Sequence, residues 1–172
     1  MQLIKEPVKS LQEGELVISR IFEAPLDHVW RTWTDPDRVK LWWGPGGFSS
    51  PVCRIDLRVG GVYLVCMRSP LGKDYWNTGV YREIVPGERI VATDSFADDQ
   101  GHIVPARYYG FNPAYPLEML VTATFEKFDG RVKLTLEHAG LPVGLDRVGR
   151  RESWSQSLDK FAQALKAPES SN

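Results

Sequence analysis

His138 is the side chain of this sequence best suited to acid–base chemistry. Residues 131–138 alternate apolar and polar side chains, and His138 falls on the apolar side of that alternation. A neutral imidazole there could orient a ligand or move a proton near neutral pH. The alternative is a core histidine bonded to backbone. We favour that alternative, because no serine, cysteine or carboxylate partner can be assigned to His138 from the sequence.

Asp94 and Tyr81 are further, weaker candidates for catalysis. Asp94 shares a strand face with Ile90, Ala92 and Phe96, so burial could raise its pKa and make it the general base of an enzyme. A residue in water at the end of a strand fits the same pattern. Tyr81 completes the set of groups that an enzyme with an internal cavity could use.

Large apolar side chains offer the walls of a cavity for a small molecule. Such cavities are lined by aromatic and apolar side chains with a few polar groups. Ordinary core packing is the competing explanation for each of them, and at Trp42-Trp43, beside the loop 44–47, the two explanations are about equal. That loop could also flex as a lid. The predicted lining comprises Trp42, Trp43, Met67, Trp76, Phe96, His138, Trp154 and Leu158.

No motif indicates a metal or a cofactor. Cys53 and Cys66 are the only cysteines, without CxxC spacing or a neighbouring histidine, so two reduced thiols are favoured over a disulfide. The glycine-rich loop 44–47 follows a predicted helix and precedes a strand, which reverses the order of a phosphate-binding loop. We expect neither a metal site nor a cofactor site.

The elements that must position these residues follow from periodicity and turn signals. Alternation predicts a first strand over 15–22, and Pro25 and Pro36 mark the starts of two short helices, the second over 36–43. Apolar residues at steps of four, three and four predict a C-terminal helix over 146–166. An antiparallel meander lies between them, with predicted strands over 52–57, 62–68, 75–85, 88–96, 118–127 and 131–138 and a crossing loop over 103–117.

One charged side chain needs a partner. Arg20 lies between Ile18 and Phe22 on the presumed inner face of the first strand, where burial is costly without a carboxylate. A structural ion pair is therefore expected. The carboxylates considered as its partner are Asp56, Asp94 and Glu137.

Length and composition predict one globular domain. The 172 residues are 42% hydrophobic and 25% charged, close to the globular average. A net charge of −1 without a basic stripe argues against nucleic acid as a partner. Without an apolar run of membrane-spanning length or a signal-peptide core, we expect a cytoplasmic protein that does not insert into membranes. The predicted parts are an N-terminal extension (1–14), the domain (15–166) and a flexible tail (167–172).

Local motifs in this order of elements resemble those of a known family. They are Arg20-Ile21-Phe22 with Ala24-Pro25 and Val29-Trp30, Asp35-Pro36 with Trp42-Trp43-Gly44-Pro45, Asp56 to Tyr63, Gly79 to Ile84 with Pro86 to Ile90, and His138 to Pro142. Together they resemble the activator of heat-shock protein 90 ATPase homologue-like family. This family is a branch of the SRPBCC superfamily, which includes START and birch-pollen-allergen folds.

The resemblance implies an α+β START-like helix-grip fold. In this fold a curved antiparallel sheet of six or seven strands wraps round a long C-terminal helix, with a cavity between them and two short helices after the first strand. Members bind lipids, hormones or polyketides, some cyclise or hydrate substrates, and family members often form homodimers. The eukaryotic namesake stimulates a chaperone. The fold alone does not choose among these functions.

The residues favour a binding protein over an enzyme, because cavity-type side chains are present and paired catalytic groups are not. We expect a small apolar or amphipathic molecule to bind in an internal cavity without a cofactor. The alternatives are an enzyme (a cyclase, hydratase or hydrolase) acting in the same cavity, and an interaction module that activates a chaperone ATPase.

Overall fold

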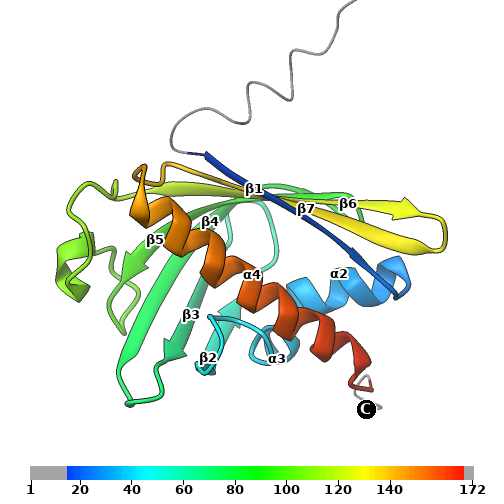
Figure 1. Cartoon of the computed structure of the whole chain (residues 1–172), viewed down its shortest axis with the longest axis horizontal. Coiled ribbons are helices and arrows are strands. Elements are labelled where there is room, and N and C mark those ends of the chain that lie inside the picture. Colours follow the sequence, from blue (N-terminus) through cyan, green and yellow to red (C-terminus); the bar gives the residue numbers. More distant parts are fainter. Residues whose placement is uncertain (1–14, 169–172) are drawn as a thin grey trace, which may run out of the picture.

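The computed structural model describes residues 15–168, in which a curved sheet holds a long helix on its concave side (Figure 1). The predicted extension 1–14 and the end of the predicted tail lie outside the described residues. In chain order the elements are β1 (Glu15–Phe22), α2 (Leu26–Thr34), α3 (Pro36–Val39), β2 (Ser49–Ile55), β3 (Val62–Arg68), β4 (Asp74–Val85), β5 (Arg89–Ala97), the short 3-10 helix η1 (Ala106–Tyr109), β6 (Met119–Phe128), β7 (Arg131–Ala139) and α4 (Leu145–Lys166).

All neighbouring strands of the sheet are antiparallel. The order is β1-β7-β6-β5-β4-β3-β2, so each strand from β2 onward pairs with the next one along the chain. β1 is the exception, because it pairs with β7 through a register that sets Leu16 opposite His138. The first and second strands thus form the two edges. This arrangement confirms the predicted α+β helix-grip fold, with seven strands.

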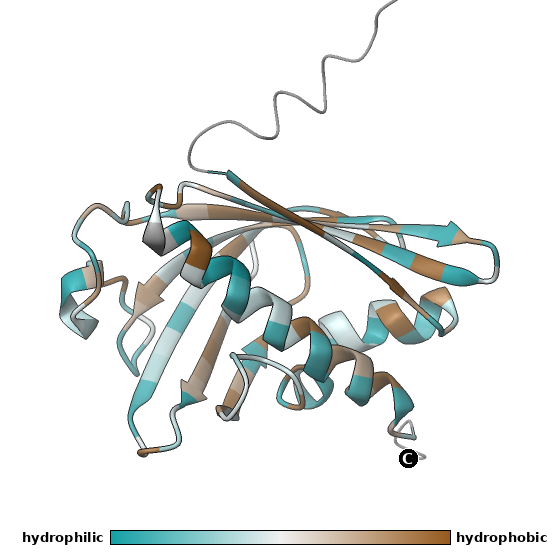
Figure 2. Cartoon of the chain, viewed as in Figure 1, coloured by the Kyte–Doolittle hydropathy of each residue, from teal (hydrophilic) through white to brown (hydrophobic). Residues whose placement is uncertain are grey.

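α4 lies across the concave face and closes the core (Figure 1). Hydrophobic and hydrophilic stretches alternate along it (Figure 2), and one side of it is buried. Trp154, Leu158 and Phe161 supply that side, and Leu158 and Phe161 are both 0% exposed. The spacing of these apolar residues predicted the helix to within one residue of its observed start.

Arg20 has a different partner from those considered in the sequence. Its Nη2 lies 3.0 Å from the Asp159 carboxylate on α4 and donates to the Ser155 carbonyl at 3.1 Å. The inner-face assignment of Arg20 was therefore correct. The three proposed carboxylates were not its partners, because the helix packed on the sheet brings a nearer carboxylate to β1.

The second short helix ends earlier than predicted. Asp35 caps it by accepting from the Asp37 amide at 2.9 Å, but the helix stops at Val39 and not at residue 43. The chain then turns and buries Trp42, which is 1% exposed and donates to the Thr32 carbonyl at 2.9 Å. β2 likewise occupies residues 49–55 where 52–57 had been predicted.

The two cysteines are free thiols on neighbouring strands, as the sequence favoured. Cys53 pairs with Val65 and Val52 pairs with Cys66, so the thiols are one residue out of register. Side chains of successive residues point to opposite faces, and the two sulfurs therefore face apart.

Candidate functional site

A cavity of about 370 Å³ lies between α4 and the concave face of the sheet. Its wall is built from α4, from the loop after α3, from the strands β3, β4, β5 and β7, and from the crossing loop before β6. The lining residues are Trp43, Gly44, Pro45, Phe48, Met67, Tyr75, Asn77, Asp94, Phe111, Tyr115, His138, Gly149, Arg150, Ser153, Trp154 and Ser157.

Part of the predicted lining lies at this wall. Trp43, Met67, His138 and Trp154 line the cavity, and Asp94, considered only as a catalytic candidate, lines it with them. These residues come from the loop after α3, from three strands and from α4. The fold therefore brings together side chains that are widely separated in the sequence.

A smaller inner pocket of about 70 Å³ adjoins the cavity. Trp42 and Tyr81 line this pocket and do not line the main cavity. Trp43, Asp94 and Trp154 line both spaces, so they form the boundary between them. Trp42 is thus a core residue that touches the inner end of the site.

The other predicted lining residues lie elsewhere. Trp76 stands between Tyr75 and Asn77 on β4, and since those two line the cavity, its side chain leaves the opposite face. Phe96 packs behind the wall, with its ring centroid 5.2 Å from that of Phe111. Leu158 is fully buried in the core between α4 and the sheet.

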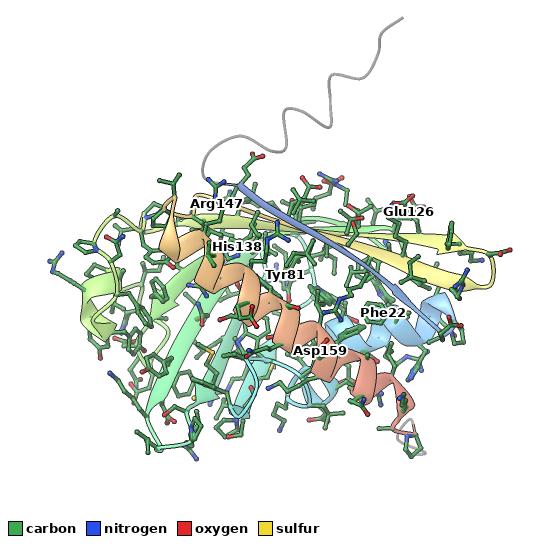
Figure 3. The ribbon with its side chains drawn as sticks, in the orientation of Figure 1. Phe22, Tyr81, Glu126, His138, Arg147 and Asp159 are labelled. Atoms are coloured by element: carbon green, nitrogen blue, oxygen red, sulfur yellow. The ribbon has the colours of Figure 1, made fainter. Side chains whose placement is uncertain are left out.

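Asp94 and His138 form the polar centre of the cavity. Asp94 is 6% exposed and His138 is 1% exposed, and His138 Nε2 lies 3.5 Å from Asp94 Oδ2. Figure 3 places His138 where α4 crosses the sheet. Asp94 is therefore the carboxylate neighbour that the sequence could not assign to His138. The two residues lie on β5 and β7, which are separated by β6, so the register of both strand pairs brings them together.

A hydrogen bond from Trp154 determines which nitrogen of the His138 ring carries the proton. The Trp154 indole Nε1 donates to His138 Nδ1 at 2.9 Å, and an indole N–H is only a donor. In the neutral ring Nδ1 is then the acceptor, and the proton sits on Nε2, toward Asp94. Nε2 is buried and makes no hydrogen bond within the described residues.

The other carboxylate oxygen of Asp94 is already in use. The Tyr63 hydroxyl lies 3.1 Å and the Asn77 side-chain amide 3.3 Å from Asp94 Oδ1. Tyr63 also lies 3.0 Å from the Thr93 carbonyl, so its single proton serves one of two acceptors. The polar centre thus keeps two atoms beside each other with unused capacity, Asp94 Oδ2 and His138 Nε2–H.

Burial shifts the pKa values of this pair in opposite directions. Burial lowers the pKa of His138 to about 3, and the positive charge of Arg150 also lowers it. Burial raises the pKa of Asp94, while Arg150 and the hydrogen bonds from Tyr63 and Asn77 act to lower it. The imidazole is accordingly neutral at physiological pH.

Arg150 is the charged side chain of the cavity wall on α4. It is half-buried, its Nη2 lies 3.4 Å from the Tyr115 hydroxyl, and its guanidinium carbon stands 5.5 Å from the Tyr115 ring centroid. No carboxylate among the described residues lies within ion-pair distance of Arg150. Its charge acts on both members of the polar centre.

The loop proposed as a lid is fastened to α4. The Ser157 hydroxyl donates to the Gly44 carbonyl at 2.7 Å, and the Gly46 amide donates to the Gln156 side chain at 2.9 Å. The Lys160 ammonium donates to the carbonyls of Pro45 and Phe48, each at 3.1 Å. This part of the wall is held in place by three side chains from neighbouring positions on one helix, Gln156, Ser157 and Lys160.

The described residues contain no cluster of three or more His, Cys, Asp or Glu side chains that could hold a metal ion. Within the same part of the chain, no helix is long and apolar enough to cross a bilayer.

Sequence reasoning missed several lining residues. Arg150 lies one helical turn before Trp154, so the periodicity of the helix could have placed it on the cavity face. Phe111 and Tyr115 lie in the aromatic-rich crossing loop, whose path gave no periodic signal. Asn77 could have been found only through the faces of β4.

One family model covers most of the chain. The model described as activator of Hsp90 ATPase homolog 1-like protein matches residues 23–166. The chain belongs to this family. No curated protein matches its sequence.

Solved structures of several bacterial proteins share the fold of this chain. A crystal structure of a protein from Chromobacterium violaceum is 28% identical, with a TM-score of 0.75 over 91% of this chain and 100% of the other. An NMR structure from Arthrobacter aurescens is 20% identical, with a TM-score of 0.75 over 95% and 91% of the two chains. The AHSA1 protein from Silicibacter pomeroyi is 24% identical, with a TM-score of 0.70 over 88% and 96%. Similarities at such low identity concern the fold.

Proposed function

We propose that this family member binds one small, mainly apolar molecule in the cavity between α4 and the sheet. The observation that carries the proposal is a cavity of about 370 Å³ with aromatic walls around a single buried polar pair. Cavities of this volume and composition are typical of small-molecule sites. The aromatic walls supply apolar contact, and the polar pair orients the ligand.

The test is a titration with N-phenyl-1-naphthylamine, a neutral apolar dye that fluoresces more strongly in apolar surroundings. We expect saturable binding of one dye per chain. Ser153 lines the cavity on α4, so Ser153→Phe should fill part of the space and weaken binding at least tenfold, or about 1.4 kcal/mol.

Gln163→Phe is the matched control. Gln163 is exposed on the same helix and does not line the cavity, so this variant adds the same ring outside the site. It should bind the dye as the unaltered protein does. Equal binding by Ser153→Phe and Gln163→Phe would mean that the dye binds elsewhere and would remove this support.

A second candidate is an enzyme acting in the same cavity. The observation that favours it is the Asp94–His138 pair, a buried carboxyl with a raised pKa beside an imidazole. A carboxyl of this kind suits proton transfer to or from a bound substrate. The test is whether a bound molecule is chemically converted. Conversion by the unaltered protein that is lost in Asp94→Asn, while binding is retained, would favour an enzyme over a binding protein.

The family description points to a third candidate, activation of the Hsp90 ATPase. Stimulation of Hsp90 ATP hydrolysis by the purified chain is the readout. Stimulation that persists in Ser153→Phe would assign that activity to a surface and not to the cavity.

A further inference from the structure

We infer that the cavity ligand is a planar hydroxylated carboxylic acid, with its carboxylate paired to Arg150 and its hydroxyl bonded from the cavity side to both Asp94 Oδ2 and His138 Nε2. The inference rests on the proposed function and names the class of molecule bound. Three features of the wall carry it: an unpaired cation, an unused donor–acceptor pair, and flat aromatic sides.

The cation is the first feature. Among the described residues Arg150 forms no ion pair, and its hydrogen bond and its ring contact are both with Tyr115. Its charge also acts at longer range on Asp94 and His138. A guanidinium presents a planar fork of donors that matches a carboxylate, and its bond with an ion is stronger than one with a neutral phenol. A ligand carboxylate would supply the direct ion-pair partner that no described carboxylate supplies.

The donor–acceptor pair is the second feature. Because Trp154 holds the His138 proton on Nε2, this atom is a donor, and Asp94 Oδ2 beside it accepts in the ionised form. Buried polar atoms are rarely left without partners. A hydroxyl both donates and accepts, so one ligand group satisfies both atoms.

The positive charge of Arg150 argues against a cationic ligand. A buried carboxyl in an aromatic cavity also suits an ammonium ligand. Arg150 lines the same cavity and its charge acts on both Asp94 and His138, so a cation bound there would be repelled. An anion with a neutral polar group fits both charges of the wall.

The aromatic sides are the third feature. Trp43, Tyr75, Phe111 and Trp154 contribute rings to the wall, and the Tyr75 and Phe111 rings are stacked 5.7 Å apart. Flat side chains of this kind pack most closely against a flat ligand. We therefore place an aromatic or similarly planar skeleton between the two polar groups.

The test uses three hydroxy acids of increasing length: 4-hydroxybenzoate, 4-hydroxycinnamate and 6-hydroxy-2-naphthoate. Each is compared with the acid that lacks the hydroxyl and with its own methyl ester, by displacement of N-phenyl-1-naphthylamine and by calorimetry. For at least one length, we expect the hydroxy acid to bind about tenfold or more tightly than either comparison compound.

Variants assign each preference to its residue. Arg150→Gln should abolish the preference for acid over ester, while Arg151→Gln, which removes an exposed neighbouring charge outside the cavity, should keep it. His138→Asn keeps an acceptor for Trp154 at the position of Nδ1 and removes Nε2. It should abolish the preference for the hydroxyl and leave the preference for the acid.

The outcomes separate the two proposals. If the dye binds in the cavity but no acid is preferred over its ester, the inference is wrong and the proposed function stands. If Arg150→Gln weakens the dye as much as the acid, Arg150 shapes the cavity and does not read a carboxylate, which also overturns the inference. If neither dye nor acids bind, the proposed function fails with it.

Discussion

At the residue scale, His138 couples the fold to pH. Its folded pKa of about 3 lies below the unfolded value, because burial and Arg150 disfavour the charged ring. Between pH 6.5 and about 3 the unfolded chain therefore holds a proton at His138 that the folded chain does not. Stability from this residue is present above the unfolded pKa and falls as the pH falls.

We predict that His138→Asn flattens the loss of stability on acidification. In this window the unfolding free energy of the unaltered protein should fall more steeply than that of the variant, by up to about 1.4 kcal/mol per pH unit. Asp94 faces His138, and its pKa is raised. Its contribution to stability therefore depends on pH in the opposite direction, because it is lost as the pH rises through that pKa. Urea unfolding between pH 4 and 7 measures the slopes, and parallel curves would contradict a neutral buried His138.

The polar centre also marks the limit of sequence reasoning. Alternation along β7 put His138 on an apolar face, and alternation along β5 did the same for Asp94. Their contact depends on how β5, β6 and β7 align. Strand periodicity fixes the face on which a residue lies, but not which residue of that face lies beside it two strands away. For the same reason the Trp154 indole could be assigned to the cavity but not to His138 Nδ1.

At the element scale, the attachment of the loop after α3 to α4 is testable. Ser157 is 5% exposed and its hydroxyl donates to the Gly44 carbonyl. Ser157→Ala should cost about 1–3 kcal/mol, because it leaves a buried carbonyl without its donor. Ser19→Ala, which removes an exposed hydroxyl contact, is the control and should cost less than about 0.5 kcal/mol. Equal urea-unfolding midpoints for Ser157→Ala and the unaltered protein would show that the Ser157 hydrogen bond does not hold the loop.

Two glycines should respond to alanine with opposite signs. At Gly79 on β4 a Cβ would collide with the Thr93 carbonyl and the Tyr63 ring, so Gly79→Ala should destabilise by about 1–3 kcal/mol. At Gly149 on α4 a Cβ meets no atom within 4 Å, and alanine favours the helix, so Gly149→Ala should stabilise by up to about 1 kcal/mol. Thermal unfolding of both variants checks this, and the same sign in both would contradict the packing described for β4.

Elements were predicted well where one periodicity dominates. β1, β7 and α4 each carry a regular apolar pattern, and their observed bounds agree closely with the predicted ones. α3 was predicted too long because Trp42 and Trp43 read as helical apolar positions. They are in fact held by tertiary contacts, Trp42 in the core and Trp43 at the cavity, which no local pattern could reveal.

At the scale of the whole molecule, ligand binding and folding are linked. A molecule that binds only the folded chain stabilises it by about 2.7 kcal/mol at a concentration one hundred times its dissociation constant. We predict this shift for N-phenyl-1-naphthylamine with the unaltered protein and with Gln163→Phe. Ser153→Phe, measured at the same dye concentration, should gain much less. Equal gains in all three proteins would place the dye outside the cavity.

The whole-molecule view also explains why some aromatic substitutions are poor tests of binding. Trp42 stacks on Trp33 with ring centroids 4.8 Å apart and is almost fully buried, so its removal would disturb the core. Ser153 lines the cavity, and its side chain makes no hydrogen bond with the residues that the structure describes. A larger side chain at residue 153 therefore fills the cavity while disturbing the packing of the core less than removal of Trp42 would.

The most direct measurement is native mass spectrometry of the freshly purified protein, compared with the same sample after denaturation. We predict a discrete small molecule held noncovalently at one per chain, present in Gln163→Phe and absent or reduced in Ser153→Phe. An acid released on denaturation would also agree with the role inferred for Arg150. A protein that carries no such molecule, and that binds none from a panel of planar apolar compounds and hydroxy acids, would contradict the claim that this cavity is a ligand site.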